Sequence, residues 1–368
     1  MSMSRRAVVG LGVLGASVAV TGGAVLFRDS PALRGILGDV TTLRGYAGGE
    51  KMAFIQNPKT VAALRGFGLA LNAERAGSVE MARDPQLLGT RPQFLWPSSS
   101  PLVELARRYS KILRDQVIFN SPIVIYSWTP YADALVRAGL AKKSGAHYFI
   151  IDAKGLVEAV LARKSWRALS QQDLYGTLRL ISTDPNKSNS GFMFAGLAAN
   201  LLAGDVVTAQ SLPGVLPQLV ELFRGMGYKP DSSGKVFDDY IAGGPGAEPL
   251  VVGYENQLIE WILADTDRWA RVEAAAGPAK PVALYPVPTV YSAHPLLALA
   301  PDANRLIDAL TSQELQTIGW RDHGFRGPLG SVGADTDPLI AGRMPAQVTA
   351  VLPMPDIDTM LKILQALA

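Results

Sequence analysis

The sequence predicts an α/β fold in which strands and helices alternate along the chain. Short apolar runs alternate with segments of helical spacing through most of the 368 residues. Glycine, proline or small polar residues follow several of these runs, as loops between a strand and a helix require. A hydrophobic content of 48% is enough for sizeable cores, and the length suggests two domains or one large α/β unit.

The first half of the chain supports this fold class element by element. Extended segments are predicted at residues 41–48, 68–75, 93–100 and 121–128, and helices at 58–66 and 102–113. Three of the predicted strands end in AGGEK, AGS and WPSSS, where glycine or serine leaves backbone N–H groups accessible. Ordinary strand-to-helix loops have the same composition, so these residues indicate a ligand site only in combination.

The second half repeats the alternation. Residues 178–182 (LRLIS) read as a buried strand and 191–204 as a helix, with the polar turn STDPNKSNSG between them. A further strand ends at Gly253 and Tyr254, and a helix follows from Glu255. Pro286 and Pro288 disfavour helix on their N-terminal side, which predicts an extended segment passing between two domains.

The polar turn lies where ligands collect in open α/β sheets. Ligands there bind outside the carboxyl ends of strands, beside free N–H groups and the positive end of the next helix. Ser188 to Gly191 are therefore expected to cap a helix and to direct its N–H groups at a solute. The alternative is that Ser188 or Ser190 is only a helix cap.

Composition excludes several functions. The formal charge of +3 comes from dispersed Lys and Arg, so a nucleic-acid partner is not expected. The chain has no cysteine, which excludes disulfides, thiolate chemistry and a lipid-anchored N-terminal cysteine.

The N-terminus is typical of an exported protein. Arg5 and Arg6 precede an uncharged stretch at residues 7–27, which predicts an export signal or an uncleaved membrane anchor over residues 1–28 and a linker at 29–40. The arginine pair resembles the twin-arginine signal, and the general secretion route stays open. The expected location is the periplasm or the outer face of the cytoplasmic membrane.

No catalytic motif is present, and we expect a protein that is not an enzyme and needs no cofactor. His147, His294 and His323 lie far apart in the sequence and do not have the spacing of a metal-binding motif. His294 is read as a structural turn residue. Neither a G-x-S-x-G elbow nor a phosphate-binding P-loop occurs. A Ser-Lys hydrolase is the least favoured alternative, and whether the chain binds a metal is left unknown.

The order of seven segments resembles that of extracellular solute-binding proteins of type II periplasmic fold, the receptors of ATP-driven (ABC) importers. These segments are LRGYAGGEK, AGSVEM, FLWPSSSP, SPIVIYSW, STDPNKSNSG, PLVVGYENQLIEW and ALYPVPTVYSAHPLLAL. The resemblance covers about residues 40–365. It implies two lobes, each a mostly parallel sheet flanked by helices, joined by two crossing hinge strands near VIYSW and YPVPT. Lobe 1 would comprise residues 41–126 plus 288–368, and lobe 2 residues 127–287.

The same resemblance implies that a small polar solute is clamped between the lobes and passed to a membrane permease. The implied ligand-binding residues are Gly49, Glu50, Lys51, Ser78, Ser98, Ser99, Ser121, Asp184, Ser188, Asn189, Ser190, Tyr254, Glu255 and Tyr285. The alternative is an anchored receptor that serves a sensor or a surface assembly without transport.

The ligand class stays open between an oxyanion, a metal complex and a small organic solute. An unpaired carboxylate repels an anion, so convergence of two among Glu50, Asp184 and Glu255 would favour a cation, a metal complex or an amine-bearing solute. Aromatic residues at strand ends could stack on such a ligand; they are Trp96, Trp128, Tyr254 and Tyr285.

Overall fold

A computed structural model describes residues 40–170, 174–275, 277, 279–328, 340 and 342–368. The predicted signal or anchor at residues 1–28 and nearly all of the predicted linker lie outside these residues. Within the described ranges, every helix is too short or too polar to cross a bilayer.

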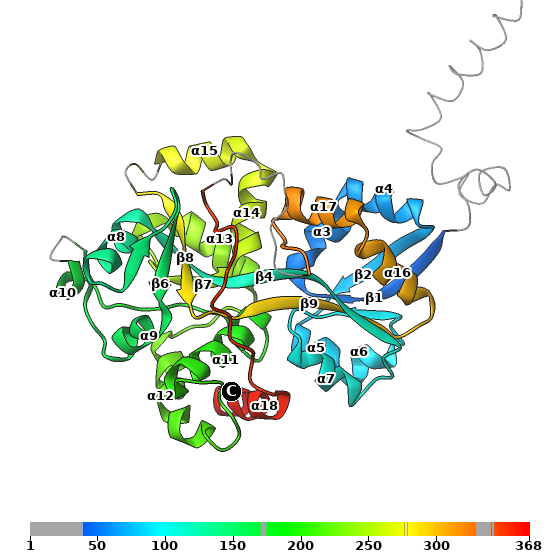
Figure 1. Ribbon diagram of the computed structural model, residues 1–368, viewed down its shortest axis with the longest axis horizontal. Helices are drawn as coiled ribbons and strands as arrows, with labels where there is room; N and C mark the ends of the chain where they lie inside the picture. The colour runs from blue at the N-terminus through cyan, green and yellow to red at the C-terminus, as the bar shows by residue number, and fades with distance from the viewer. Residues whose placement is uncertain (1–39, 171–173, 276, 278, 329–339, 341) are drawn as a thin grey trace, which may run out of the picture.

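The predicted α/β fold with two lobes is confirmed. Figure 1 shows two groups of strands and helices side by side, joined in the middle by the long strand β4 (Arg114–Trp128) and by β9 (Tyr291–Ala298). One continuous path of hydrogen-bonded strands runs through both groups in the order β2-β1-β3-β9-β4-β8-β6-β5, and β7 pairs with β4 beside that path.

The first lobe contains the start of the described chain and returns near its end. Its strands besides β9 are β1 (Thr41–Ala47), β2 (Leu69–Arg75) and β3 (Phe94–Trp96). Its helices are η1 (Gly49–Lys51), α3 (Met52–Gln56), α4 (Pro58–Gly66), α5 (Ser78–Arg83), α6 (Pro85–Gly89), α7 (Pro101–Arg107), α16 (Asp302–Leu310) and α17 (Gln313–His323). Strand β1 is parallel to β2 and β3, whereas β9 is antiparallel to β3 and β4.

The second lobe is built from the middle of the chain. Its strands besides β4 are β5 (Ala141–Lys143), β6 (Tyr148–Asp152), β7 (Val251–Tyr254) and β8 (Pro281–Val287). Its helices are α8 (Thr129–Arg137), α9 (Ala153–Leu161), α10 (Trp166–Ser170), α11 (Asn189–Ala203), α12 (Leu212–Gly225), α13 (Ser233–Gly243), η2 (Gly244–Gly246), α14 (Glu255–Ala264) and α15 (Thr266–Ala275). Strand β6 is parallel to β8, and β4 is antiparallel to both β7 and β8.

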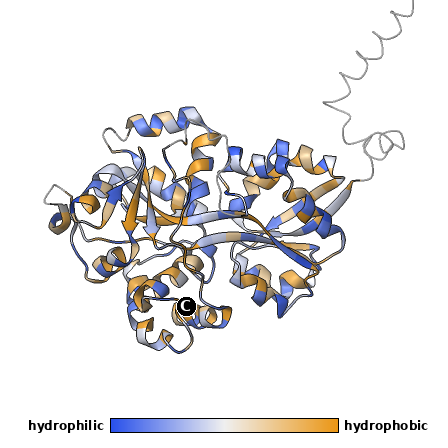
Figure 2. Ribbon diagram, in the orientation of Figure 1, coloured by the Kyte–Doolittle hydropathy of each residue, from blue (hydrophilic) through white to orange (hydrophobic). Residues whose placement is uncertain are grey.

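Strand β4 passes from one lobe to the other because it changes partners along its length. It pairs with β9 up to Pro122, and with β7 and then β8 from Ile123 onward. From Ile118 to Trp128 every side chain is buried, which matches a strand covered on both faces. Figure 2 shows the same concentration of apolar residues along the inner strands.

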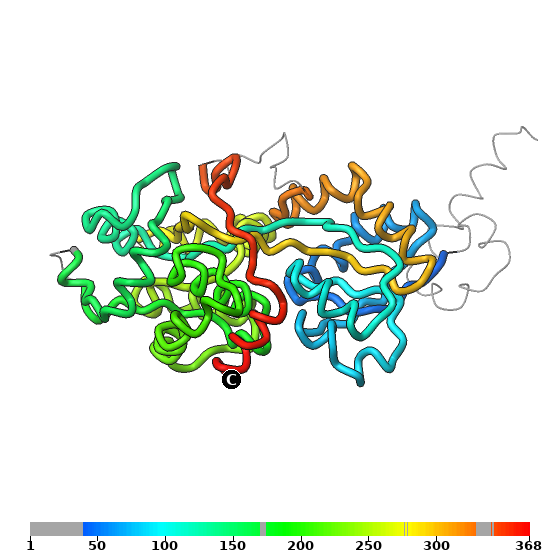
Figure 3. Tube along the Cα trace, turned by 60° about the horizontal axis from the view of Figure 1, so that its bottom comes forward, coloured from blue at the N-terminus to red at the C-terminus, as the bar shows by residue number. Residues whose placement is uncertain are grey.

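The last helix, α18 (Ile357–Ala366), packs on both lobes. It contacts α11 and α12 of the second lobe and α7 of the first. Arg108 after α7 donates two hydrogen bonds to the Asp358 carboxylate of α18, at 2.7 and 3.0 Å. Figure 3 shows the C-terminal segment running along the junction of the lobes.

Two predicted elements are wrong in detail. Residues 178–182 do not form a regular strand, because Leu178 donates to the carbonyl of Lys164 whereas Ile181 makes one parallel bridge to Val251. Their hydrogen bonds are divided between two partners, although the apolar side chains are buried. The helix predicted at 102–113 ends at Arg107, since residues 108–110 form turns and Leu113 already donates to the carbonyl of Ala298.

Candidate ligand-binding cleft

A cleft of about 1230 Å³ lies between the two lobes. Its wall in the first lobe consists of the segments that follow β1 and β2, at the carboxyl ends of these strands. Its wall in the second lobe consists of the N-terminal ends of α11 and α13 and one side of α14. The walls of the cleft therefore come from both lobes, and they include the starts of α5, α11 and α13, which offer N–H groups.

The structure separates the predicted site residues into two sets. Five of them line the cleft: Gly49, Glu50, Ser78, Ser188 and Asn189. The other nine do not line it: Lys51, Ser98, Ser99, Ser121, Asp184, Ser190, Tyr254, Glu255 and Tyr285. Most of this second set is buried and supports the cleft from behind.

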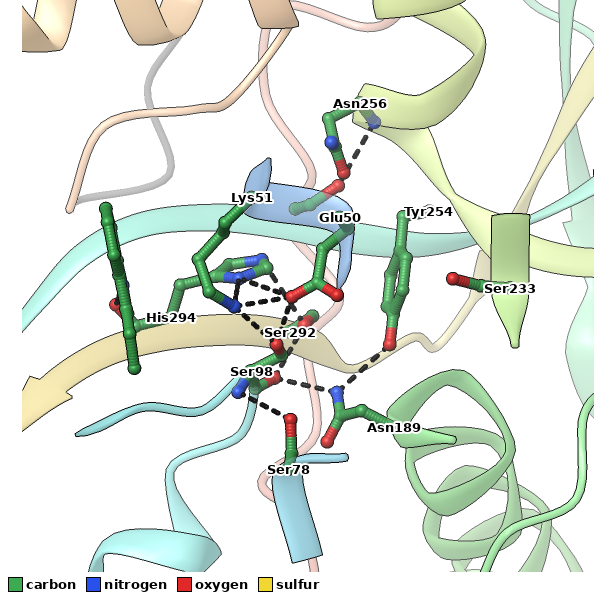
Figure 4. A network of polar contacts seen from close by, with 12 residues as sticks. Glu50, Lys51, Ser78, Ser98, Asn189, Ser233, Tyr254, Asn256, Ser292 and His294 are labelled. Carbon is green, nitrogen blue, oxygen red and sulfur yellow. Dashed lines mark hydrogen bonds and ion pairs between the residues drawn. The ribbon is translucent and has the colours of Figure 1, made fainter. Parts of the chain in front are cut away.

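Glu50 and Lys51 form the centre of a buried polar network behind the first-lobe wall (Figure 4). The Lys51 ammonium is fully buried and donates to Glu50 Oε1 at 2.5 Å and to Ser98 Oγ at 2.7 Å. Ser98 Oγ also donates to Glu50 Oε1. His294 Nδ1 lies 3.3 Å from Lys51 Nζ, and its Nε2 lies 3.4 Å from Ser292 Oγ.

Mutual attraction between Glu50 and Lys51 favours the charged forms of both side chains. Burial by itself would raise the pKa of Glu50, but Lys51 and His294 outweigh it and hold that pKa well below its usual range. Burial lowers the pKa of Lys51, and Glu50 opposes this effect. Burial and the Lys51 charge lower the pKa of His294 to about 4, so its imidazole is neutral at neutral pH.

Asn189 connects the two lobes at the floor of the cleft. Its Nδ2 donates to the backbone carbonyl of Ser98 at 2.8 Å and to Tyr254 Oη at 3.0 Å. The same Ser98 carbonyl accepts from Ser292 Oγ at 2.6 Å. Asn189 Oδ1 is buried and has no hydrogen-bond partner among the described residues. An unpaired buried acceptor costs about 1–3 kcal/mol, so this oxygen is an unusual feature of the site.

The start of α11 explains why the turn before it is so polar. Ser188 occupies the cap position, but its hydroxyl makes no capping hydrogen bond. Thr183 Oγ1 instead accepts from the backbone N–H of Gly191 at 2.7 Å and bonds with Ser190 Oγ at 2.7 Å. Gly191 is required by close approach, because a Cβ there would lie 2.3 Å from the Thr183 carbonyl oxygen. The Ser188 side chain is thus left at the cleft surface.

Glu255 has an internal partner. Arg326 donates to both of its carboxylate oxygens, at 2.6 and 2.7 Å, and Tyr285 Oη donates to Oε1 at 2.6 Å. Both charged side chains are buried. Burial by itself would lower the pKa of Arg326, but the Glu255 carboxylate outweighs this effect, so the pKa is raised. Glu255 and Tyr285 therefore belong to one ion-pair cluster, separate from Glu50.

Several cleft residues were not predicted from the sequence. Charged side chains from both lobes contribute cations (Arg75, Arg83, Lys187, Arg268) and carboxylates (Glu80, Asp84, Asp231, Asp238, Glu260). The position of Arg75 as the last residue of a predicted strand was a usable signal. Trp261 also lines the cleft, with the Arg268 guanidinium 4.3 Å from its ring centre. Across the described residues there is no group of three His, Cys, Asp or Glu side chains that could hold a metal ion.

His294 was read as a turn residue, and this reading is wrong. It lies inside strand β9, paired with Phe119 of β4, and is fully buried. The sequence could not reveal that role, because its partners Lys51 and Glu50 are brought to it only by the β1-β3-β9 order of the sheet.

Comparison with solved structures identifies the fold. The chain is similar to a periplasmic thiamin-binding protein (TM-score 0.60, 11% identity, 89% of this chain and 97% of the other). It is similar to the periplasmic binding protein AfuA from Actinobacillus pleuropneumoniae, solved with fructose-6-phosphate (TM-score 0.56, 12% identity, 88% and 96%). It is also similar to the apo ferric-ion-binding protein A of Pasteurella haemolytica (TM-score 0.56, 13% identity, 89% and 95%). Neither a protein-family model nor a curated protein sequence matches. The chain thus has the type II fold of periplasmic solute-binding proteins.

Proposed function

We propose that this protein is an exported receptor that clamps a small polar solute between its two lobes and delivers it to an ATP-driven importer. The observation that carries the proposal is the cleft itself, whose polar walls come from both lobes. A solute that contacts both walls stabilises the closed arrangement, and closure then presents one defined surface to a membrane permease. The arginine pair and apolar stretch at the N-terminus support export.

The hinge required by this function has a structural candidate in the strands that connect the lobes. Strand β4 changes its pairing between Pro122 and Ile123, a few residues before the lobe boundary proposed from the sequence at 126/127. Strands β8 and β9 return beside it in the opposite direction. Small backbone rotations in so few connections can move whole lobes.

The polar network also supports a binding role over catalysis. Ser98 Oγ and Lys51 Nζ lie 2.7 Å apart, which is the contact a Ser-Lys hydrolase would need. Glu50, however, accepts hydrogen bonds from both groups, and its charge opposes the loss of the Lys51 proton that a general base requires. Ser98 is fully buried, so its hydroxyl is closed to substrate. We therefore propose that the chain is not an enzyme.

A ligand screen tests the receptor function. The full-length protein is heated in the presence of oxyanions, divalent metals, amino acids, sugars and polyamines, and a ligand that binds the folded state raises the Tm. Calorimetry then gives Kd, and small-angle scattering gives the radius of gyration. We expect one chemical class to raise the Tm and to reduce the radius of gyration through lobe closure.

A matched pair of variants locates the binding. Ala264 lines the cleft at the end of α14, whereas Ala270 is exposed on α15 outside it. Ala264→Trp should weaken binding of the solute found in the screen at least tenfold, and Ala270→Trp should leave it unchanged. Equal effects of the two substitutions, or a solute that binds without closure, would contradict a clamp between the lobes.

A further inference from the structure

We infer that the solute carries a protonated amino group that donates to the Glu50 carboxylate of the first lobe, and that the Asn189 side-chain carbonyl of the second lobe accepts a further hydrogen bond from the same solute. This inference rests on the proposed receptor function and names the chemical class of its ligand. It is carried by two oxygen atoms that accept no hydrogen bond from the residues that the structure describes.

The first oxygen is Oε2 of Glu50. The contacts to this carboxylate from Lys51, Ser98 and His294 all end on Oε1. Oε2 accepts no hydrogen bond from any described residue, and the side chain lines the cleft with 7% of its surface exposed. Lys51 is fully buried behind the carboxylate and holds it in place by a single oxygen. The arrangement leaves one carboxylate oxygen free for a donor in the cleft.

The second oxygen is Oδ1 of Asn189. The amide orientation is fixed, because Nδ2 donates to the Ser98 carbonyl and to Tyr254 Oη. Rotating the amide by 180° would place its oxygen against the Ser98 carbonyl oxygen, which repels it. Asn189 is 7% exposed, lines the cleft, and has no donor to Oδ1 within the described part of the chain. A buried acceptor of this kind requires a donor, and the cleft is where one can enter.

The two residues are linked through Ser98. Its hydroxyl donates to Glu50 Oε1, and its backbone carbonyl accepts from Asn189 Nδ2, so both side chains are held by one residue. Figure 4 shows Glu50, Tyr254 and Asn189 gathered around Ser98 and Ser292. An ammonium group has three donors and a positive charge, which suits the free oxygen of the Glu50 carboxylate, and a further donor of the same solute would pair with Asn189 Oδ1. An oxyanion in the same place would meet a carboxylate and an amide oxygen, both of which repel it.

Two cations of the cleft, Arg75 and Arg83, lie at its surface. Arg75 and Arg83 are exposed, and neither forms an ion pair with a described residue. Arg75 extends across Gly49, where a Cβ would lie 2.7 Å from its Nε. A solute with its amino group at Glu50 can therefore direct an oxygen-rich or anionic part toward Arg75. A cleft with the Glu50 carboxylate inside and the Arg75 guanidinium at its surface favours a solute with an amino group over a simple anion.

Matched solutes test the assignment on the full-length protein. Each amine is compared with the analogue in which a hydroxyl replaces the amino group: alanine with lactate, glycine with glycolate, putrescine with 1,4-butanediol, and glucosamine with glucose. Sulfate and phosphate serve as anion probes. We expect at least one amine to raise the Tm while its hydroxyl analogue does not. For that amine, Glu50→Gln should raise Kd at least tenfold, and Glu74→Gln on exposed β2 should leave it unchanged.

The test stays decisive if Glu50→Gln folds poorly. The double variant Glu50→Gln/Lys51→Met removes both charges of the buried pair, which is far less disruptive than leaving one of them alone. It should bind the amine as weakly as Glu50→Gln. If hydroxyl analogues or oxyanions bind as well as amines, the amine assignment is wrong and the receptor stands. If no amine raises the Tm, the assignment is also wrong. If, in addition, no solute of the wider screen binds, the receptor function fails too.

Discussion

The guanidinium of Arg326 donates two hydrogen bonds, of 2.6 and 2.7 Å, to the carboxylate of Glu255, and both side chains are buried. Arg326 also donates to the backbone carbonyls of Pro345 and Ala346, so it joins the second lobe to the segment before α18. This geometry gives Glu255 a structural partner, and a contact between Glu255 and ligand stays a prediction.

Removal of Arg326 should destabilise the protein strongly. Arg326→Met leaves the Glu255 carboxylate buried without its partner, which costs about 3–5 kcal/mol. The double variant Glu255→Gln/Arg326→Met should recover most of this loss, because no unpaired charge remains. Urea denaturation measures both free energies of unfolding. Equal stability of the single variant and the wild type would contradict a structural role for the pair.

Acid should destabilise the protein through His294. Its pKa is about 4 in the folded chain and about 6.5 when unfolded, so the unfolded state binds the extra proton first. Stability from this group is complete above pH 6.5 and declines as the pH falls toward 4, by up to about 3 kcal/mol. Urea denaturation at several pH values gives the free energy of unfolding. Between pH 6.5 and 4.5 this free energy should fall less steeply with decreasing pH in His294→Leu than in the wild type. If the free energy of unfolding depends on pH in the same way in both proteins, His294 is not the group that causes the loss of stability in acid.

The two serines at the start of α11 should respond differently to substitution by alanine. Ser190 is fully buried and bonds with Thr183 Oγ1 at 2.7 Å, so Ser190→Ala should cost about 1 kcal/mol of stability. Ser188 lines the cleft without capping the helix, so Ser188→Ala should change stability by less than about 0.5 kcal/mol. Its main effect should be weaker solute binding. Calorimetric Kd and urea midpoints separate the two results, and a stability loss at Ser188 without a change in Kd would assign it a purely structural role.

The purified protein should not turn over generic ester or phosphoester substrates. The Lys51 ammonium is committed to Glu50, and Ser98 is enclosed. A spectrophotometric assay with nitrophenyl acetate and nitrophenyl phosphate checks this, with Ser98→Ala as the control. Robust turnover that disappears in Ser98→Ala would show that a nucleophile is active and would overturn the receptor proposal.

The sequence predicts the architecture well because strand periodicity and loop chemistry are local. The helix predicted at 58–66 matches α4, and the strands at 41–48 and 68–75 match β1 and β2 within one residue. Buried partners could not be predicted in the same way. Lys51 contacts His294, and Glu255 contacts Arg326, only because the sheet and the packed lobes bring distant segments together. The segment at 178–182 was misjudged because its apolar residues are buried without a continuous strand ladder.

The pairing of β3 with β9 determines the order in which the two lobes can complete their sheets during synthesis. Phe94 of β3 pairs with Ala298 of β9, and β9 separates β3 from β4 in the finished sheet. While the chain is being synthesised, the first lobe has a gap in its sheet until residues near 298 have been made. The second lobe, from continuous sequence, has all of its strands by then. Completion of the first lobe therefore waits for most of translation, and until then its apolar strand edges need protection from aggregation.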